Sequence, residues 1–155
     1  MLLQLNLLAV GATLATVASA VGNARVVNNC PFEVTTWSVG STVSGPYTLQ
    51  TGGVYSEPFT RDPRTGGRAI KTTIDRDGLY TGQPQTIFAY NLQGNHVWYD
   101  LSNVFGNAFQ GHRLVVASGD AECQAIAWED GIPPAGSQVK NCQEQADVTL
   151  SLCQG

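Results

Sequence analysis

Short stretches in which apolar and polar residues alternate dominate the chain after its first 20 residues. They are rich in Val, Ile, Thr, Tyr and Trp, which fit the pleated and half-buried surface of a sheet. Turn residues separate them at intervals of about 8–12 residues, a spacing typical of sandwiches and barrels. The pattern predicts an all-β fold, a β-sandwich of about ten short antiparallel strands. The expected strands are 24–28, 34–39, 47–50, 54–59, 69–74, 86–92, 96–101, 114–117, 125–128 and 147–152.

Three segments lack this alternation and are expected to be loops, namely 60–68, 75–85 and 129–142. The chain shows no internal repeat, no linker and no amphipathic pattern long enough for a helix of about ten residues. We therefore expect residues 21–155 to form a single domain.

The first 20 residues contain no charged side chain and run from a leucine-rich block to an A-x-A sequence at 18–20. This order is typical of a secretory signal peptide and its cleavage site. Gln4 and Asn6 interrupt the apolar block, which is short for a membrane span of about 20 residues. We predict that residues 1–20 are cleaved and that the mature chain is secreted without stable membrane insertion. The alternatives are retention of the segment as an anchor and its burial as an N-terminal element of the fold.

All four cysteines, Cys30, Cys123, Cys142 and Cys153, lie after the predicted cleavage site. An even number in an exported chain indicates two disulfides, and the lack of closely spaced pairs argues against a zinc site. Three pairings are possible, and we favour Cys30–Cys153 with Cys123–Cys142. The first would tie the opening strand to the final one across a loop of more than 100 residues, worth about 4–5 kcal/mol. The second closes a loop of about 20 residues, worth about 3 kcal/mol.

Charge narrows the range of partners. The net charge is −4, which argues against a nucleic-acid partner held by phosphate neutralisation. Five of the eight basic residues fall between positions 61 and 76, close to Asp62, Asp75 and Asp77. We expect these acids to neutralise a solvated loop there. The alternative is a basic patch for an anionic partner.

Candidate catalytic residues are few. A glycosidase needs two carboxylates about 5–9.5 Å apart, and the candidates are Glu57, Asp75, Asp77 and Asp100. A simpler interpretation of Asp75 and Asp77 is that they are turn residues whose side chains accept hydrogen bonds from backbone N–H groups. Asp100 lies near a strand end, where a local hydrogen bond to the backbone is the simpler role. We therefore expect no catalytic residue.

The sequence also offers few candidates for metal ligands or for aromatic side chains that could contact a ligand. The two histidines have no partner at metal-ligand spacing, so no metal or cofactor is expected. Trp98 and Tyr99 are adjacent in an expected strand and must point to opposite faces of its sheet. One of them could therefore lie outward and stack on a sugar ring. The simpler interpretation places every tryptophan in the core.

Several segments resemble thaumatin-like proteins in the same order along the chain: VVNNCPF at 26–32, GGRAI at 66–70, TIFAYNL at 86–92, YDLSNV at 99–104 and DVTLSLC at 147–153. With the chain length, the four cysteines and YTGQPQT at 80–86, they are most similar to the fungal Blastomyces yeast-phase-specific protein family. The resemblance implies a thaumatin-like β-sandwich and a disulfide between the first and last cysteines, in agreement with the favoured pairing.

The same resemblance weakens an enzyme assignment. Some larger thaumatin-like proteins carry an acidic cleft and bind or cut β-1,3-glucan. Their cleft glutamate falls on Ala89 here and their cleft arginine near Lys71 or Thr72, so only Asp100 matches. One carboxylate cannot serve as both proton donor and nucleophile.

The expected function is that of a small, secreted, non-catalytic protein acting at the fungal cell surface or on a cell-wall or host ligand. The weak candidates for ligand contact are Asp75, Asp77, Trp98, Tyr99 and Asp100. One alternative is a β-1,3-glucan-binding protein or weak glucanase using Asp100 with Asp75 or Asp77. Another is a secreted effector that binds a protein partner.

Overall fold

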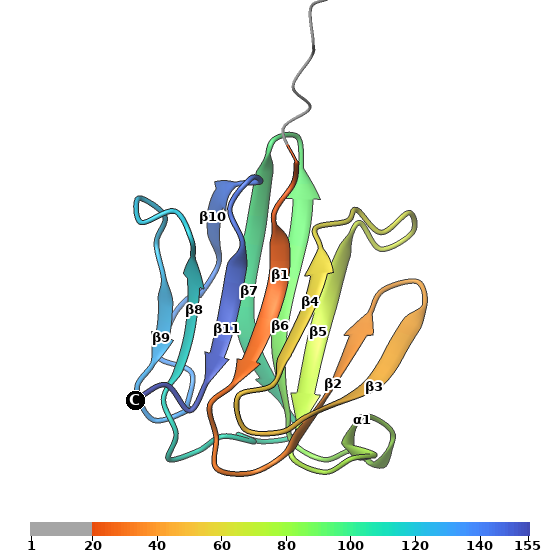
Figure 1. Cartoon of the computed structure of the whole chain (residues 1–155), viewed down its shortest axis with the longest axis vertical. Coiled ribbons are helices and arrows are strands. Elements are labelled where there is room, and N and C mark those ends of the chain that lie inside the picture. The colour runs from red at the N-terminus through yellow and green to blue at the C-terminus, as the bar shows by residue number, and fades with distance from the viewer. Residues whose placement is uncertain (1–19) are drawn as a thin grey trace, which may run out of the picture.

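Eleven strands and one short helix make up residues 20–155, the part of the chain that the computed structural model describes. Two sheets face each other (Figure 1). One has the order β4 (Val54–Pro58), β1 (Asn23–Asn28), β11 (Val148–Leu152), β8 (Leu114–Ser118) and β9 (Ile126–Trp128). The other has the order β10 (Lys140–Gln143), β7 (His96–Val104), β6 (Gln85–Gln93), β5 (Gly67–Thr73), β2 (Val34–Val39) and β3 (Val43–Leu49).

The core lies between the two sheets and follows from the alternation along the strands. In β1 and β11 every second side chain is buried, and the register places Val26 beside Leu150. Phe88 of β6 and Leu101 of β7 are opposite each other in the facing sheet and are also buried. Each such side chain contributes about 1.5–3 kcal/mol by leaving water. The predicted β-sandwich is therefore confirmed.

One strand pair departs from the predicted antiparallel arrangement. β1 and β11 are parallel, whereas the other paired strands are antiparallel. A short hairpin forces its two strands to be antiparallel, but β1 and β11 are distant in sequence and are free of that constraint. Parallel pairing brings the ends of both strands to the same end of the sheet.

Both favoured disulfides are present. Cys30 follows β1 and Cys153 follows β11, and their Cα atoms are 4.9 Å apart. Cys123 bonds to Cys142 of β10, with Cα atoms 5.5 Å apart. The first bond fastens the parallel central pair of the five-stranded sheet. The second joins the β8–β9 connection to the edge of the six-stranded sheet.

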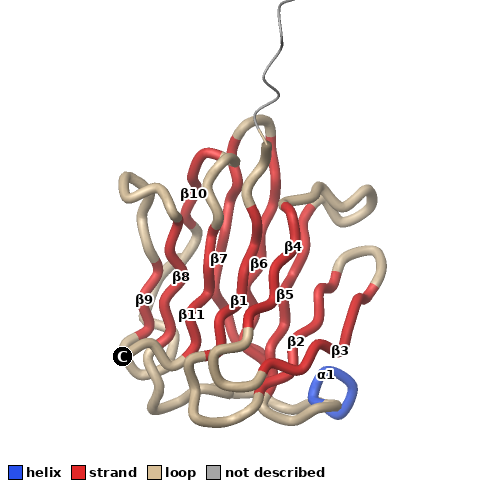
Figure 2. Tube along the Cα trace, viewed as in Figure 1, coloured by secondary structure: helices blue, strands red, loops and turns tan. Residues whose placement is uncertain are grey.

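All three expected loops contain some regular structure (Figure 2), and the segment 60–68 includes the start of β5. The segment 75–85 includes the helix α1 (Gly78–Thr81), and the segment 129–142 includes the start of β10. The alternation did not reveal β10 because its four residues, KNCQ, offer only Cys142 as an apolar side chain. β3 begins at Val43 rather than at residue 47, and its exposed edge accommodates Pro46.

The predicted signal peptide lies outside the described residues except for Ala20. Within residues 20–155, no helix has the length and apolar character that crossing a membrane would require.

Candidate functional site

A shallow depression runs across the outer face of the six-stranded sheet, and we call it the outer groove. It consists of two adjacent hollows, of about 180 and 400 Å³, which share Ala89 and Tyr90 as lining residues. Strand register explains the depression: Ala69 of β5 is opposite Ala89 of β6, which is opposite Asp100 of β7. Small side chains on adjacent strands leave the sheet surface uncovered. The groove is lined by Val39, Gly40, Thr65, Gly67, Arg68, Ala69, Lys71, Ala89, Tyr90, Asn91, Trp98, Tyr99, Asp100 and Val139.

Trp98 and Tyr99 point to opposite faces of β7, as the sequence predicts. The Trp98 side chain lies on the outer face and is 42% exposed. Tyr99 is 1% exposed, and its hydroxyl donates a hydrogen bond to the backbone carbonyl of Gln124. Trp98 is therefore the one of the two that can contact a ligand in the outer groove. The other two tryptophans, Trp37 and Trp128, are fully buried.

Asp100 lies on the outer face between the groove and a neighbouring hollow. Its carboxylate accepts the backbone N–H of Leu101 at 2.8 Å, the local hydrogen bond that the sequence indicates. The described residues that line the hollows on either side of Asp100 include no second carboxylate. Ala89, directly across from Asp100, contributes only a methyl group.

The structure does not bring Asp75 and Asp77 to Asp100. Both follow the end of β5 at Thr73, four residues along that strand from Ala69, which is level with Asp100. Four residues span about 13 Å, and the two intervening strand spacings add about 10 Å sideways. Asp77 precedes α1, and its side chain makes no capping hydrogen bond. These separations exceed the spacing that a pair of glycosidase carboxylates requires.

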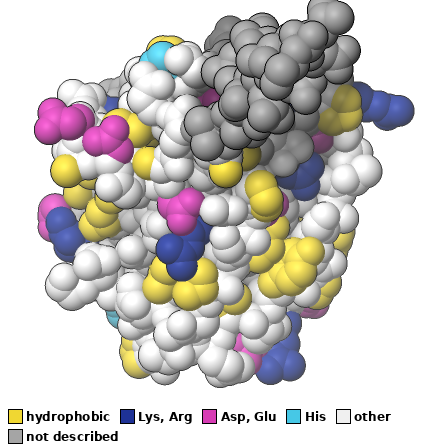
Figure 3. Space-filling view, turned by 45° about the horizontal axis from the view of Figure 1, so that its top comes forward, with side chains coloured by type: hydrophobic (Ala, Val, Ile, Leu, Met, Phe, Trp, Pro, Cys, Tyr) yellow, Lys and Arg dark blue, Asp and Glu magenta, His cyan; other side chains and the backbone are white. Residues whose placement is uncertain are grey.

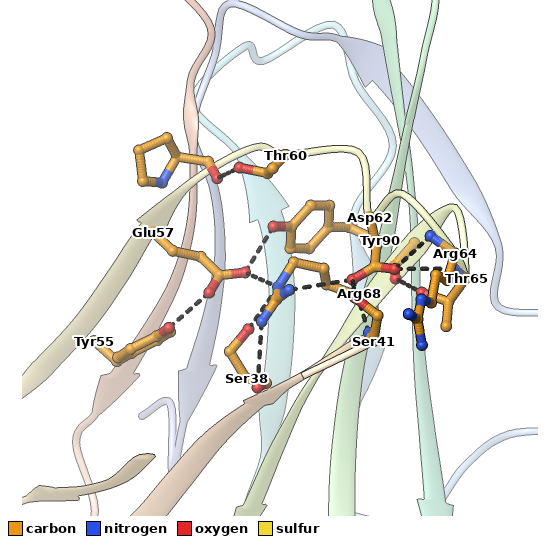
Figure 4. A network of polar contacts seen from close by, with 12 residues as sticks. Ser38, Ser41, Tyr55, Glu57, Thr60, Asp62, Arg64, Thr65, Arg68 and Tyr90 are labelled. Atoms are coloured by element: carbon orange, nitrogen blue, oxygen red, sulfur yellow. Dashed lines mark hydrogen bonds and ion pairs between the residues drawn. The ribbon is translucent and has the colours of Figure 1, made fainter. Parts of the chain in front are cut away.

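Asp62 belongs to a buried polar network that the sequence does not reveal (Figure 4). Its carboxylate accepts the backbone N–H groups of Ser41, Arg64 and Thr65 at 2.8–3.0 Å. It also lies 3.5 Å from the Arg68 guanidinium. The hydrogen bonds from Thr65 and Ser41 hold the pKa of Asp62 well below its usual value, so the carboxyl group stays ionised.

Glu57 of β4 is the second carboxylate of this network. It accepts the hydroxyls of Tyr55 and Tyr90 at 2.6 Å each and lies 3.5 Å from Arg68. Burial, and then the adjacent Glu57 carboxylate, raise the pKa of both tyrosines, which therefore remain hydrogen-bond donors. Figure 4 shows these side chains converging from both sheets. The Arg68 guanidinium also donates a hydrogen bond to the Ser38 hydroxyl at 2.9 Å, so the network fastens the two layers together.

Among the basic residues of the 61–76 stretch, Arg68 and Arg76 form ion pairs, and one of their three pairs uses an aspartate of that stretch. Arg68 pairs with Asp62, as predicted, but also with Glu57. Arg76 pairs with Glu33, at 2.6 Å, rather than with the adjacent aspartates. On the face shown in Figure 3, charged side chains are scattered among uncharged ones and form no continuous basic patch.

Comparison with known families and sequences places this architecture in context. The model of the family described as "Blastomyces yeast-phase-specific protein" matches residues 11–154. The antigenic thaumatin-like protein of Arthroderma benhamiae is 28% identical, covering 86% of this chain and 72% of the relative. The secreted thaumatin-like protein calA of Emericella nidulans is 26% identical, covering 95% of each chain.

Solved structures show the same architecture. The protein elicitor MoHrip2 from Magnaporthe oryzae superposes with a TM-score of 0.70 at 27% identity, covering 86% of this chain and 99% of the elicitor. The thaumatin-like xylanase inhibitor TLXI has a TM-score of 0.54 at 11% identity, covering 84% of this chain and 99% of the inhibitor, which demonstrates a shared fold alone.

Proposed function

Because this chain belongs to the Blastomyces yeast-phase-specific protein family, we propose that it is a secreted, non-catalytic binding protein that holds a cell-wall polysaccharide in its outer groove. Its site of action is the fungal cell surface. Export is supported by the two disulfides, which persist in oxidising compartments, and by the relative in Emericella nidulans that is named as secreted.

The observation that carries the proposal is the residue opposite Asp100. A glycosidase places a second carboxylate within about 9.5 Å of the first, and the cross-strand neighbour here is Ala89. Asp100 remains available as a hydrogen-bond acceptor for a sugar hydroxyl. A groove with one carboxylate supports binding without bond cleavage.

The choice of a sugar chain as ligand rests on Trp98. An exposed indole offers a flat apolar surface that stacks on the apolar face of a sugar ring. Asn91 is directly across from Trp98, and Asp100 is two residues along the same strand. One aromatic platform flanked by an amide and a carboxylate supplies both stacking and hydrogen bonding. The open groove suits a polymer that extends beyond the contact.

Affinity for laminarin, a soluble β-1,3-glucan, tests the proposal. Trp98→Ala is expected to weaken laminarin binding about tenfold or more, equivalent to about 1.4 kcal/mol. Tyr47→Ala is the matched control, because Tyr47 is 40% exposed but lies on β3, at the far edge of the same sheet. Equal affinities for wild type and Trp98→Ala would contradict the groove as the binding site. Absence of laminarin binding would favour the alternative of a protein partner.

A further inference from the structure

Exposed apolar side chains gather at the end of the sandwich that carries α1, away from the outer groove. Ile74, Tyr80 and Phe105 are 43%, 73% and 65% exposed. Figure 1 shows α1 and the connection from β7 to β8 together at this lower end. The Tyr80 ring packs nearly perpendicular to that of buried Trp37, with ring centroids 6.5 Å apart, and this contact holds the tyrosine in position. We call this region the end surface.

Phe105 is held outward by its backbone. Its φ of +62° lies in the left-handed region, which costs a residue with a side chain about 1–2 kcal/mol. Hydrogen bonds fix the surrounding turn: Asn103 donates to Asn107 at 2.8 Å, and Thr86 donates to Asn103 at 3.0 Å. The turn therefore exposes a large apolar ring in a strained backbone conformation. Such strain is concentrated at functional sites, including ligand-binding sites.

A hollow of about 290 Å³ lies beside this turn. The connection from β5 to β6 and the connection from β7 to β8 both contribute to its lining, which consists of Ile74, Asp75, Gln83, Pro84, Asn107 and Ala108. Gly106, next to Phe105, packs so closely on Pro84 that a Cβ atom there would lie 3.2 Å from the proline ring. The backbone next to Phe105 therefore packs against the wall of a hollow that is large enough for an apolar side chain.

The charge at the end surface is negative. Asp75 lines the hollow, and Asp77 lies two residues further on. None of the ion pairs among residues 20–155 includes either aspartate. Arg76 lies between them, but its guanidinium is bound to both carboxylate oxygens of Glu33, at 2.6 and 3.0 Å. The two free carboxylates are complementary to a basic group on a partner.

We propose that the end surface docks an extended segment of another extracellular protein, one that places an apolar side chain in the hollow next to a Lys or Arg. The apolar side chain would fill the space beside Phe105, and the cation would face Asp75 and Asp77. This site shares no residue with the outer groove, so the two proposals stand or fall separately.

Selection of phage-displayed random peptides on the mature protein tests the site directly. Peptides that bind wild type are retained, and those that also bind the variant Phe105→Asn are removed. Asparagine tolerates the left-handed backbone, so this variant removes the ring without adding strain. The expected consensus pairs an apolar residue with Lys or Arg. The selected peptides should bind Phe105→Asn at least tenfold more weakly than wild type. They should bind the double variant Asp75→Asn/Asp77→Asn more weakly than wild type at low salt only, because salt screens the attraction between exposed charges.

Val43→Ser is the control, because it removes an exposed apolar side chain outside both proposed sites, and peptide affinity should not change. A thermal melt of each variant verifies folding. The site is rejected if no peptide discriminates wild type from Phe105→Asn or if the consensus is acidic. Self-association of wild type that Phe105→Asn abolishes would also overturn the proposal, because a second copy of the chain would then be the occupant.

Discussion

Single side chains distinguish the two faces of each sheet in this sandwich. The period of two along β7 was enough to predict that Trp98 and Tyr99 diverge, but not which of them is outward. That choice depends on the five-stranded sheet, which covers Tyr99. The contacts of Asp62 could not be predicted from sequence, because its carboxylate oxygens accept backbone N–H groups of the following turn and of the β2–β3 connection, which is distant in sequence. Glu57 was a candidate acid in the sequence, and only the fold reveals its structural role.

Asp62→Asn tests the polar network through pH. The pKa of Asp62 is lowered in the folded protein, so its carboxylate stabilises the fold above the unfolded pKa of about 3.9. That stability is lost as the pH falls toward the folded pKa. We expect the variant to melt at a lower temperature than wild type at pH 7, with the difference shrinking between about pH 5 and pH 2. Asp77→Asn, which removes no capping bond, should melt as wild type does. A pH-independent difference would contradict this account.

At the scale of elements, the strands with clear alternation were predicted and the exceptions have physical causes. β10 escaped prediction because an edge strand with one buried side chain has no recognisable period. The parallel direction of β1 and β11 is a property of the assembled sheet rather than of either strand. Of the three possible cysteine pairings, the favoured one ties the first strand to the last. The structure places these strands, β1 and β11, side by side.

The two disulfides should differ in their contribution to stability. Cys30–Cys153 spans 123 residues and Cys123–Cys142 spans 19. In the chain-entropy model the double variant Cys30→Ser/Cys153→Ser loses about 4–5 kcal/mol, and Cys123→Ser/Cys142→Ser loses about 3 kcal/mol. Urea unfolding of the purified proteins measures both. The reverse order of stability would show that contacts around β10, rather than loop length, dominate.

For the whole molecule, we propose that different faces of the sandwich have different roles. The space between the sheets holds the core and the polar network, the outer groove is proposed for a polysaccharide, and the end surface for a protein segment. The β-sandwich was predictable from period and turn spacing. The groove was not, because it depends on which small residues the register aligns across β5, β6 and β7. The sequence could not show that Asp75 and Asp77 lie far from Asp100, because the spacing of residues along the chain does not give their distance across a sheet.

The release of reducing sugar from laminarin is the measurement that tests the central claim most directly. It is made at a protein concentration that saturates laminarin binding, with Asp100→Asn in parallel. Asp100 faces Ala89, and among residues 20–155 no second carboxylate lines the hollows beside it. We therefore predict that wild type and variant both bind and that neither releases sugar above the buffer control. Sugar release by wild type that Asp100→Asn abolishes would contradict the account and identify the protein as a glucanase.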